Sequence, residues 1–94
     1  MIIRLYTYEV PVGKQSEYLK ATAEKIKPFW ESHGCQSYDV WQPAEGGMSF
    51  IKPMFFEDMA AMEKAMALPE AKPIVDLFKS FAINSSSTVY IQKA

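Results

Sequence analysis

The sequence predicts a single α+β domain whose elements follow the order β-α-β-β-α-β over residues 1–94. Three observations support this prediction. Short runs rich in Ile, Val, Tyr and Phe alternate with longer stretches in which apolar residues recur every three or four positions. No linker, repeat or low-complexity tract separates these segments. A chain of 94 residues also leaves no room for a second hydrophobic core.

Residues 2–10 are expected to form the first strand, and both faces of that strand are largely apolar or aromatic. Because side chains alternate along a strand, Leu5 should lie on one face, with Tyr6 and Tyr8 on the other. Arg4 has the same parity as the two tyrosines, so it is expected beside them. A sheet with one face in water alternates apolar and polar residues, and this strand therefore predicts a sheet covered on both faces.

The segment from residue 14 to residue 32 is predicted to be an amphipathic helix. Its apolar residues, which include Ile26 and Trp30, form one stripe along the helix surface. Pro28 lies inside this pattern and predicts a kink or a weakened last turn. Gly34 then provides a favourable C-terminal stop.

Two strands are expected next, at 35–42 and 48–55, joined by a hairpin loop at 43–47. The two glycines of that loop have no helix after them, so they predict a turn and not a phosphate-binding loop. Pro53 donates no ladder hydrogen bond and predicts a strand end, a bulge or an edge.

The last third of the chain predicts a helical region followed by the fourth strand. Glu57 or Asp58 can cap the first helix, and the Leu-Pro pair at 68–69 should interrupt the helical region. A polar loop is predicted at 84–87, and the closing strand at 88–92.

This order of elements corresponds to the arrangement of ferredoxin-like folds, with two helices on one face of a four-stranded sheet. The other face still carries aromatic and aliphatic residues, and nothing remains in the chain to bury it. A contiguous apolar face is rarely left in water. A homodimer with two sheets packed face to face is therefore expected.

Composition excludes several classes of function. The net charge is −1, the pI is about 5.8 and the lysines are scattered, so no concentrated basic surface is available for nucleic acid. His33 and Cys35 are the only residues of their kinds, which excludes multi-histidine metal sites, cysteine clusters and an internal disulfide. A lone cysteine fits a reducing compartment, and a cytoplasmic location is expected. No apolar run approaches the roughly 20 residues that cross a bilayer, so no membrane partner is expected either.

The sequence resembles the dimeric α/β-barrel superfamily, in particular small proteins of the antibiotic-biosynthesis-monooxygenase-like and NIPSNAP-like groups. The resemblance lies in YEVPVGKQSEYLKA at 8–21, in FIKPMFFEDMAAMEKAM at 50–66 and in the LPEAK break at 68–72. It spans nearly the whole chain and implies a ferredoxin-like sandwich that forms a dimeric α/β barrel. The superfamily includes cofactor-free monooxygenases that form quinones, haem-degrading enzymes, isomerases and proteins without known activity.

The resemblance also excludes one of these activities. Haem-degrading members use a tryptophan and, ten residues later, a histidine haem ligand, and these positions fall near Ala65 and Val75. Their first-strand asparagine falls near Tyr6. Neither Ala65 nor Val75 can play the corresponding role, so haem degradation is not expected. The cofactor-free members imply no bound cofactor and no metal.

Four residues are candidates for catalysis. Tyr6, Tyr38 and Arg4 could stabilise an enolate oxygen in a pocket between the sheet and the helices. His33 could act as a general base, although its position at the end of the first helix also suits a C-terminal cap. Lys52 and Arg4 are charges on strands, and the simplest interpretation is that one of them pairs with an acid such as Asp39 or reaches a rim of the sheet.

Aromatic and methionine side chains could line the pocket or simply fill the core and the dimer interface. The candidate pocket residues are Tyr8, Trp30, Trp41, Phe50, Met62 and Tyr90.

The sequence thus leaves two functions open. The first is a small-molecule enzyme or binder of the antibiotic-biosynthesis-monooxygenase-like class, acting without a cofactor on a small apolar, aromatic or polyketide-like ligand. The second is a non-enzymatic dimeric module that binds a ligand or another protein, because the same fold hosts such roles. Isomerase or lactone chemistry would need an acid-base group such as His33 or Glu9, and both lie towards the periphery of the predicted fold.

Overall fold

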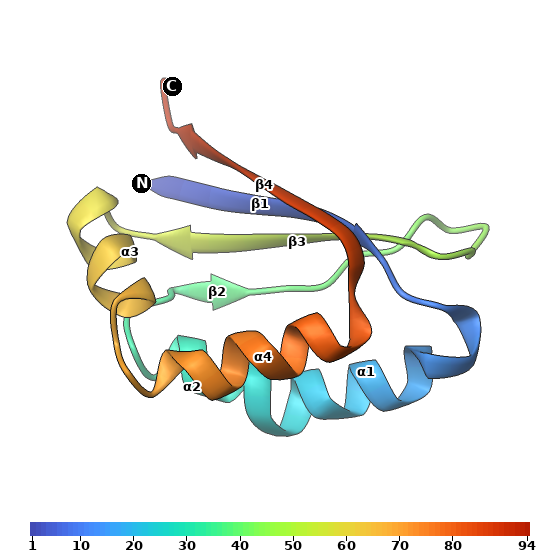
Figure 1. Ribbon diagram of the computed structural model, residues 1–94. Coiled ribbons are helices and arrows are strands. Elements are labelled where there is room, and N and C mark those ends of the chain that lie inside the picture. Colours follow the sequence, from blue (N-terminus) through green and yellow to red (C-terminus); the bar gives the residue numbers. More distant parts are fainter.

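The computed structural model describes residues 1–94 and shows one four-stranded antiparallel sheet with helices on one face (Figure 1). The strands run in the order β2-β3-β1-β4, which is the topology of a ferredoxin-like sandwich. Their bounds are β1 (Ile2–Glu9), β2 (Ser37–Tyr38), β3 (Ser49–Phe56) and β4 (Ile83–Ile91). The predicted α+β class and element order are therefore confirmed.

The helices α1, α2 and α4 lie along one face of the sheet, and α3 lies beside the end of β3 (Figure 1). The bounds of the helical segments are η1 (Val12–Lys14), α1 (Gln15–Ala21), η2 (Thr22–Ile26), α2 (Lys27–Glu31), α3 (Met59–Met66) and α4 (Ala71–Phe81). As predicted, the side chain of Asp58 caps α3 by accepting a hydrogen bond from the backbone N–H of Ala61 at 2.8 Å. Gly34, at φ +103°, ends the first helical segment in the left-handed conformation that glycine adopts without strain.

The first helical segment is continuous through α1, η2 and α2, but its middle is a π-helical turn. The N–H of Lys27 bonds to the carbonyl of Thr22, five residues earlier. Pro28, which follows, has no N–H to continue the regular α-helical ladder. The irregularity expected at Pro28 thus appears one turn earlier, as a local change of helical pitch, and the helix does not separate into two.

The second strand is much shorter than the predicted 35–42. Opposite Pro53 the backbone N–H of Asp39 makes only a long 3.4 Å contact with the proline carbonyl, and the proline has no N–H to return a bond. Pairing resumes at one isolated bridge, where Trp41 and Ile51 exchange two hydrogen bonds of 2.9 Å. Pro53 itself lies inside β3, so the prediction that it marks a strand end or an edge was wrong for β3; its effect falls on β2.

The predicted polar loop at 84–87 is also wrong, because these residues belong to β4. Their backbone pairs with β1, and the hydroxyls of Thr7 and Ser86 lie 3.0 Å apart. Asn84 takes a positive φ of 54° near the register shift in β1, and its side chain donates to Glu9 at 2.7 Å. A polar edge strand that faces solvent shows no apolar alternation, so its sequence resembles a loop.

The outer face of the sheet, opposite the helices, is uncovered in the single chain (Figure 1) and carries apolar side chains together with a few hydroxyl residues such as Thr7 and Thr88. The strand pairing assigns to it Ile3, Leu5, Trp41, Ile51, Pro53, Phe55 and Tyr90. Trp41 is 60% exposed and Tyr90 is 50% exposed. None of the helices combines the length and the apolar character that crossing a membrane requires.

Candidate functional site

The inner face of the sheet, towards the helices, contains a row of cross-strand pairs from β1 and β3. Along this row lie Ile2 with Phe56, Arg4 with Met54, Tyr6 with Lys52, and Tyr8 with Phe50. The outer pairs of the row are apolar or aromatic, whereas the two central pairs each contain a cation. The same alternation that predicts Arg4 beside Tyr6 therefore also brings Lys52 under the helices.

A cavity of about 330 Å³ lies between these central pairs and the helices. Seven of its eleven lining residues are hydrophobic, three are cationic and none is acidic. The lining residues are Arg4, Tyr6, Trp30, Lys52, Met54, Met66, Ile74, Val75, Phe78, Lys79 and Ser85. Lys79 and Ser85 are exposed, so the cavity reaches the surface beside them. Its composition suits a flat ligand that carries a negative or partly negative oxygen.

Lys52 is the most unusual residue of the site, because it is only 3% exposed and has no acidic partner. Its Nζ atom lies 3.6 Å from the ring centroid of Phe78, 4.0 Å from that of Tyr6 and 5.2 Å from that of Tyr38. The expected pairing with Asp39 is absent, since Asp39 lies near Lys27 instead, at 3.4 Å. Lys52 is thus a buried amine surrounded by aromatic faces.

This environment lowers the pKa of Lys52 to about 7. Loss of hydration is the largest cause, and the charge of Arg4 lowers the pKa further. Cation–π contacts favour the ammonium form by about 0.5–2 kcal/mol, which offsets only part of the cost of burying it. Near neutral pH, Lys52 therefore has a large fraction of free amine, which surface lysines lack.

Arg4 provides a permanent charge beside this amine. Its Nε donates to the hydroxyl of Ser87 at 3.3 Å, and its guanidinium carbon lies 5.3 Å from the ring centroid of Tyr6. Burial raises the pKa of Tyr6, while the charge of Arg4 opposes the rise. Tyr6 is therefore a neutral hydroxyl at physiological pH. The structure brings the sequence-predicted Arg4 and Tyr6 together at the cavity.

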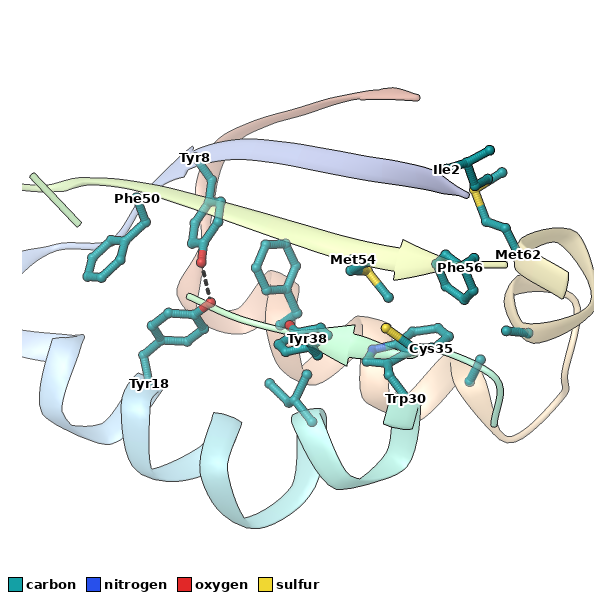
Figure 2. Close-up of a cluster of buried hydrophobic side chains, with 14 of the residues drawn as sticks. Ile2, Tyr8, Tyr18, Trp30, Cys35, Tyr38, Phe50, Met54, Phe56 and Met62 are labelled. Atoms are coloured by element: carbon teal, nitrogen blue, oxygen red, sulfur yellow. Dashed lines mark hydrogen bonds between the residues drawn. The ribbon is translucent and has the colours of Figure 1, made fainter. Parts of the chain in front are cut away.

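An aromatic cluster is formed by Tyr8, Tyr18, Phe50 and Phe78 beside the cavity. Figure 2 shows the first three of these residues packed together. The hydroxyls of Tyr8 and Tyr18 form a buried hydrogen bond of 2.5 Å, drawn as a dashed line in Figure 2. Burial raises the pKa of both tyrosines. Tyr8 and Phe50, which were candidate pocket residues, thus pack in the filled core and do not line the cavity.

The other buried candidates occupy different positions (Figure 2). Trp30 lines the cavity, whereas Met62 belongs to α3 and is packed in the core. The ring of Tyr38 is fully buried and contacts Lys52, and its hydroxyl has no hydrogen-bond partner. Burial raises the pKa of Tyr38, so this hydroxyl is neutral as well.

The remaining candidates lie far from the cavity lining. Trp41 and Tyr90 belong to the outer face of the sheet. His33 is exposed at the end of α2, where its Nδ1 lies 2.7 Å from the carbonyl of Phe29 and donates to it, and its ring stacks on the ring of Phe29. This geometry is the helix-capping arrangement, and the structure does not bring His33 to Arg4 and Tyr6. No group of three histidine, cysteine or acidic side chains is arranged to hold a metal ion.

Comparison with known proteins shows that the sequence matches one protein family. The chain matches the family described as antibiotic biosynthesis monooxygenase over residues 1–77, which is most of its length. The chain belongs to this family. No curated protein sequence matches it.

Solved structures share the fold of this family member at low sequence identity. SnoaB, a cofactor-independent oxygenase from Streptomyces nogalater, is 15% identical with a TM-score of 0.86, over 99% of this chain and 93% of the other. An uncharacterized NIPSNAP domain protein from Burkholderia xenovorans is 18% identical with a TM-score of 0.74, over 100% and 96% of the two chains. A conserved protein from Methanosarcina mazei is 19% identical with a TM-score of 0.79, over 99% and 94%.

Proposed function

We propose that the protein is a cofactor-independent oxygenase for a flat aromatic substrate that forms an enolate. The observation that supports this most strongly is the cavity itself, in which a buried amine without an acidic partner lies beside a guanidinium between aromatic walls. Such a site favours a substrate anion, and the neutral amine can accept the proton whose removal creates that anion. Membership of the antibiotic biosynthesis monooxygenase family agrees with this chemistry.

In the proposed reaction, a ring CH₂ group that lies opposite a ring carbonyl of the substrate, and is conjugated with it through the aromatic rings, loses one proton to the Nζ of Lys52. Arg4 stabilises the enolate oxygen that forms, and the ring of Tyr6 supports the face of the substrate. The carbanion gives its electrons to molecular oxygen, a C–O bond forms, and Lys52 returns its proton to the resulting peroxide. The O–O bond then breaks as water leaves with the second hydrogen of the CH₂ group. One oxygen atom ends in the quinone carbonyl and the other in water.

Oxygen uptake with a hydroxylated anthrone tests this proposal. The wild-type protein should consume one O₂ for each quinone formed, and K52M should lose roughly 100-fold or more of the rate, the usual contribution of a general base. R4Q should lose about tenfold or more through weaker enolate stabilisation. K20M is the matched control, because Lys20 is exposed on α1 away from the cavity, and its rate should equal that of wild type.

A wild-type rate no higher than that of buffer would contradict the oxygenase proposal. If the anthrone nevertheless raised the melting temperature, the cavity would serve binding alone, which is the non-enzymatic alternative.

A second copy of the chain is the partner proposed for the outer face of the sheet. The centre of this face is apolar, with Leu5 and Pro53 paired across β1 and β3, and large aromatics such as Trp41 and Tyr90 are exposed on it. Faces of this kind are usually buried by association. Light scattering should give twice the chain mass of 10.7 kDa, and a stable monomer would contradict the proposal.

A further inference from the structure

We propose that Lys52 is also a covalent nucleophile, which condenses with the carbonyl group of a small keto acid bound in the cavity to form an imine. This activity goes beyond the proposed oxidation, because it needs no oxygen and leaves the substrate at the same oxidation level. It uses the same cavity, but the amine of Lys52 acts as a nucleophile that attacks carbon, whereas in the proposed oxidation it acts as a base that accepts a proton.

The first requirement is a free amine near neutral pH, and the surroundings of Lys52 provide it. The titratable or charged groups near Lys52 are Arg4 and Tyr6 of β1, Tyr38 of β2, Lys79 of α4 and Cys35. None of these groups is a carboxylate that would hold the amine as an ammonium ion. The low pKa of about 7 agrees with this geometry. Desolvation in an apolar pocket and a neighbouring cation are the two means by which proteins activate a nucleophilic lysine, and Lys52 has both.

The second requirement is space at the amine for the reacting carbonyl. Lys52 lines the cavity of about 330 Å³, which lies at the small end of the range of ligand pockets, about 300–1,000 Å³. A compact ligand is therefore favoured. The apolar side chains around the amine, among them Met54 and Ile74, limit the water that would hydrolyse an imine.

The third requirement is a group that recognises the acid of the keto acid, and Arg4 supplies it. Arg4 and Lys52 both lie against the ring of Tyr6, with the guanidinium carbon at 5.3 Å and Nζ at 4.0 Å from the ring centroid. Only the Nε of Arg4 is used, in its bond to Ser87, so its terminal N–H groups can bind a carboxylate in a bidentate manner. In a 2-keto acid the carboxylate and the carbonyl are adjacent, which matches the neighbouring guanidinium of Arg4 and amine of Lys52.

The reaction is balanced without an oxidant or a reductant. The lone pair of Nζ attacks the carbonyl carbon, a C–N bond forms, and the C=O π electrons move to oxygen, which takes up a proton. One of the two amine protons passes to this oxygen as the carbinolamine forms. The second passes to the hydroxyl group as that group leaves, so that water departs and the C=N bond forms. The net change is a primary amine and a ketone converted into an imine and one water.

The experiment traps the imine anaerobically with sodium cyanoborohydride, using 2-oxobutanoate as the probe and peptide mass mapping as the readout. At pH 7.5, Lys52 should be labelled roughly a hundredfold faster than Lys79, which lines the same cavity but is exposed to solvent. K52M should lose the adduct, and K20M should keep it. Labelling of Lys52 at the rate of Lys79 in the wild-type protein would overturn the proposal, whether or not K52M folds.

A second comparison tests the role of Arg4. R4Q should slow labelling by 2-oxobutanoate about tenfold relative to labelling by butanone, which has the ketone but no carboxylate. Both probes react with the same amine, so a change in the reactivity of Lys52 alters the two rates equally and does not alter their ratio. An unchanged ratio would overturn the keto acid as the substrate class. Because the trapping excludes oxygen, its failure is distinguishable from failure of the oxygenase proposal.

Discussion

The aromatic cluster and the cavity lie side by side between the same sheet and the same helices, and they share Phe78. In the aromatic cluster, the polar atoms of Tyr8 and Tyr18 satisfy each other and the rings fill the space. In the cavity, Lys52 has no acidic or hydrogen-bonding partner and the space is left open. Both regions are built from the same alternating strands, so the difference comes from individual side chains.

This difference separates residues that stabilise the fold from residues that reduce its stability. A buried hydroxyl pair contributes to stability, whereas a buried amine without a partner costs free energy. Proteins retain such costs mainly at functional sites. The contrast therefore supports the cavity as the candidate functional region, with the aromatic cluster as its structural support.

The largest expected effect concerns Lys52 and pH. Because the folded protein holds the pKa of Lys52 near 7 and the unfolded chain has an ordinary lysine pKa of about 10.4, the unfolded chain binds more protons between these pH values. The free energy of unfolding of the wild-type protein should therefore rise with pH across this window. Relative to K52M, which lacks the titrating amine, the rise should be roughly 3–5 kcal/mol between pH 7 and pH 10.

Urea unfolding at both pH values and at a fixed protein concentration measures this difference. K52M should also be the more stable protein at pH 7, because methionine removes the buried amine at similar volume. K20M serves as the control and should follow the wild-type curve. If the free energy of unfolding changed with pH equally in K52M and wild type, the buried amine would carry no energetic cost. The proposed contrast between the cavity and the aromatic cluster would then fail.

A smaller effect is expected in the aromatic cluster. Y18F removes one hydroxyl of the Tyr8–Tyr18 pair and leaves the other buried without its partner. The protein should lose about 1–2 kcal/mol of stability, measured by urea unfolding at pH 7. No loss would show that this hydrogen bond does not support the cluster.

The smallest effect is expected at Tyr38, which lies against the cavity lysine. Its hydroxyl is buried without a hydrogen-bond partner, so Y38F removes an unsatisfied group and leaves the ring in place. Stability should stay within about 0.5 kcal/mol of wild type or rise slightly. A loss as large as that of Y18F would mean that this hydroxyl is bonded in solution, and the two tyrosine environments would then be alike.

Much of the fold could be predicted from the sequence, because periodicity reports which faces are buried. The helical stripe containing Ile26 and Trp30 and the alternation of β1 both led to the correct elements. The errors occur where backbone pairing decides the structure without an apolar pattern. β2 is cut short by a proline on its partner strand, and β4 begins with a polar segment that is held by pairing with β1.

The candidate site could be predicted only in part. Parity correctly brought Arg4 beside Tyr6, but the expectation for the two strand cations was that one of them pairs with an acid such as Asp39 or reaches a sheet rim. The signal that could have identified Lys52 is its shared parity with Phe50 and Met54, which places it on the covered face of β3. Charged residues are rarely buried without a partner, so the ordinary expectation favoured an ion pair. That expectation fails at functional sites in particular.

The most direct test of the central claim is the titration of Lys52 by NMR with ¹³C-labelled lysine, using K52M to assign its signal. The midpoint should lie near pH 7, well below the ordinary lysine value of about 10.4. A midpoint for Lys52 that coincides with those of the exposed lysines would contradict the claim. The buried amine would then be an ordinary ammonium ion, and neither base catalysis nor imine formation at this cavity could rest on it.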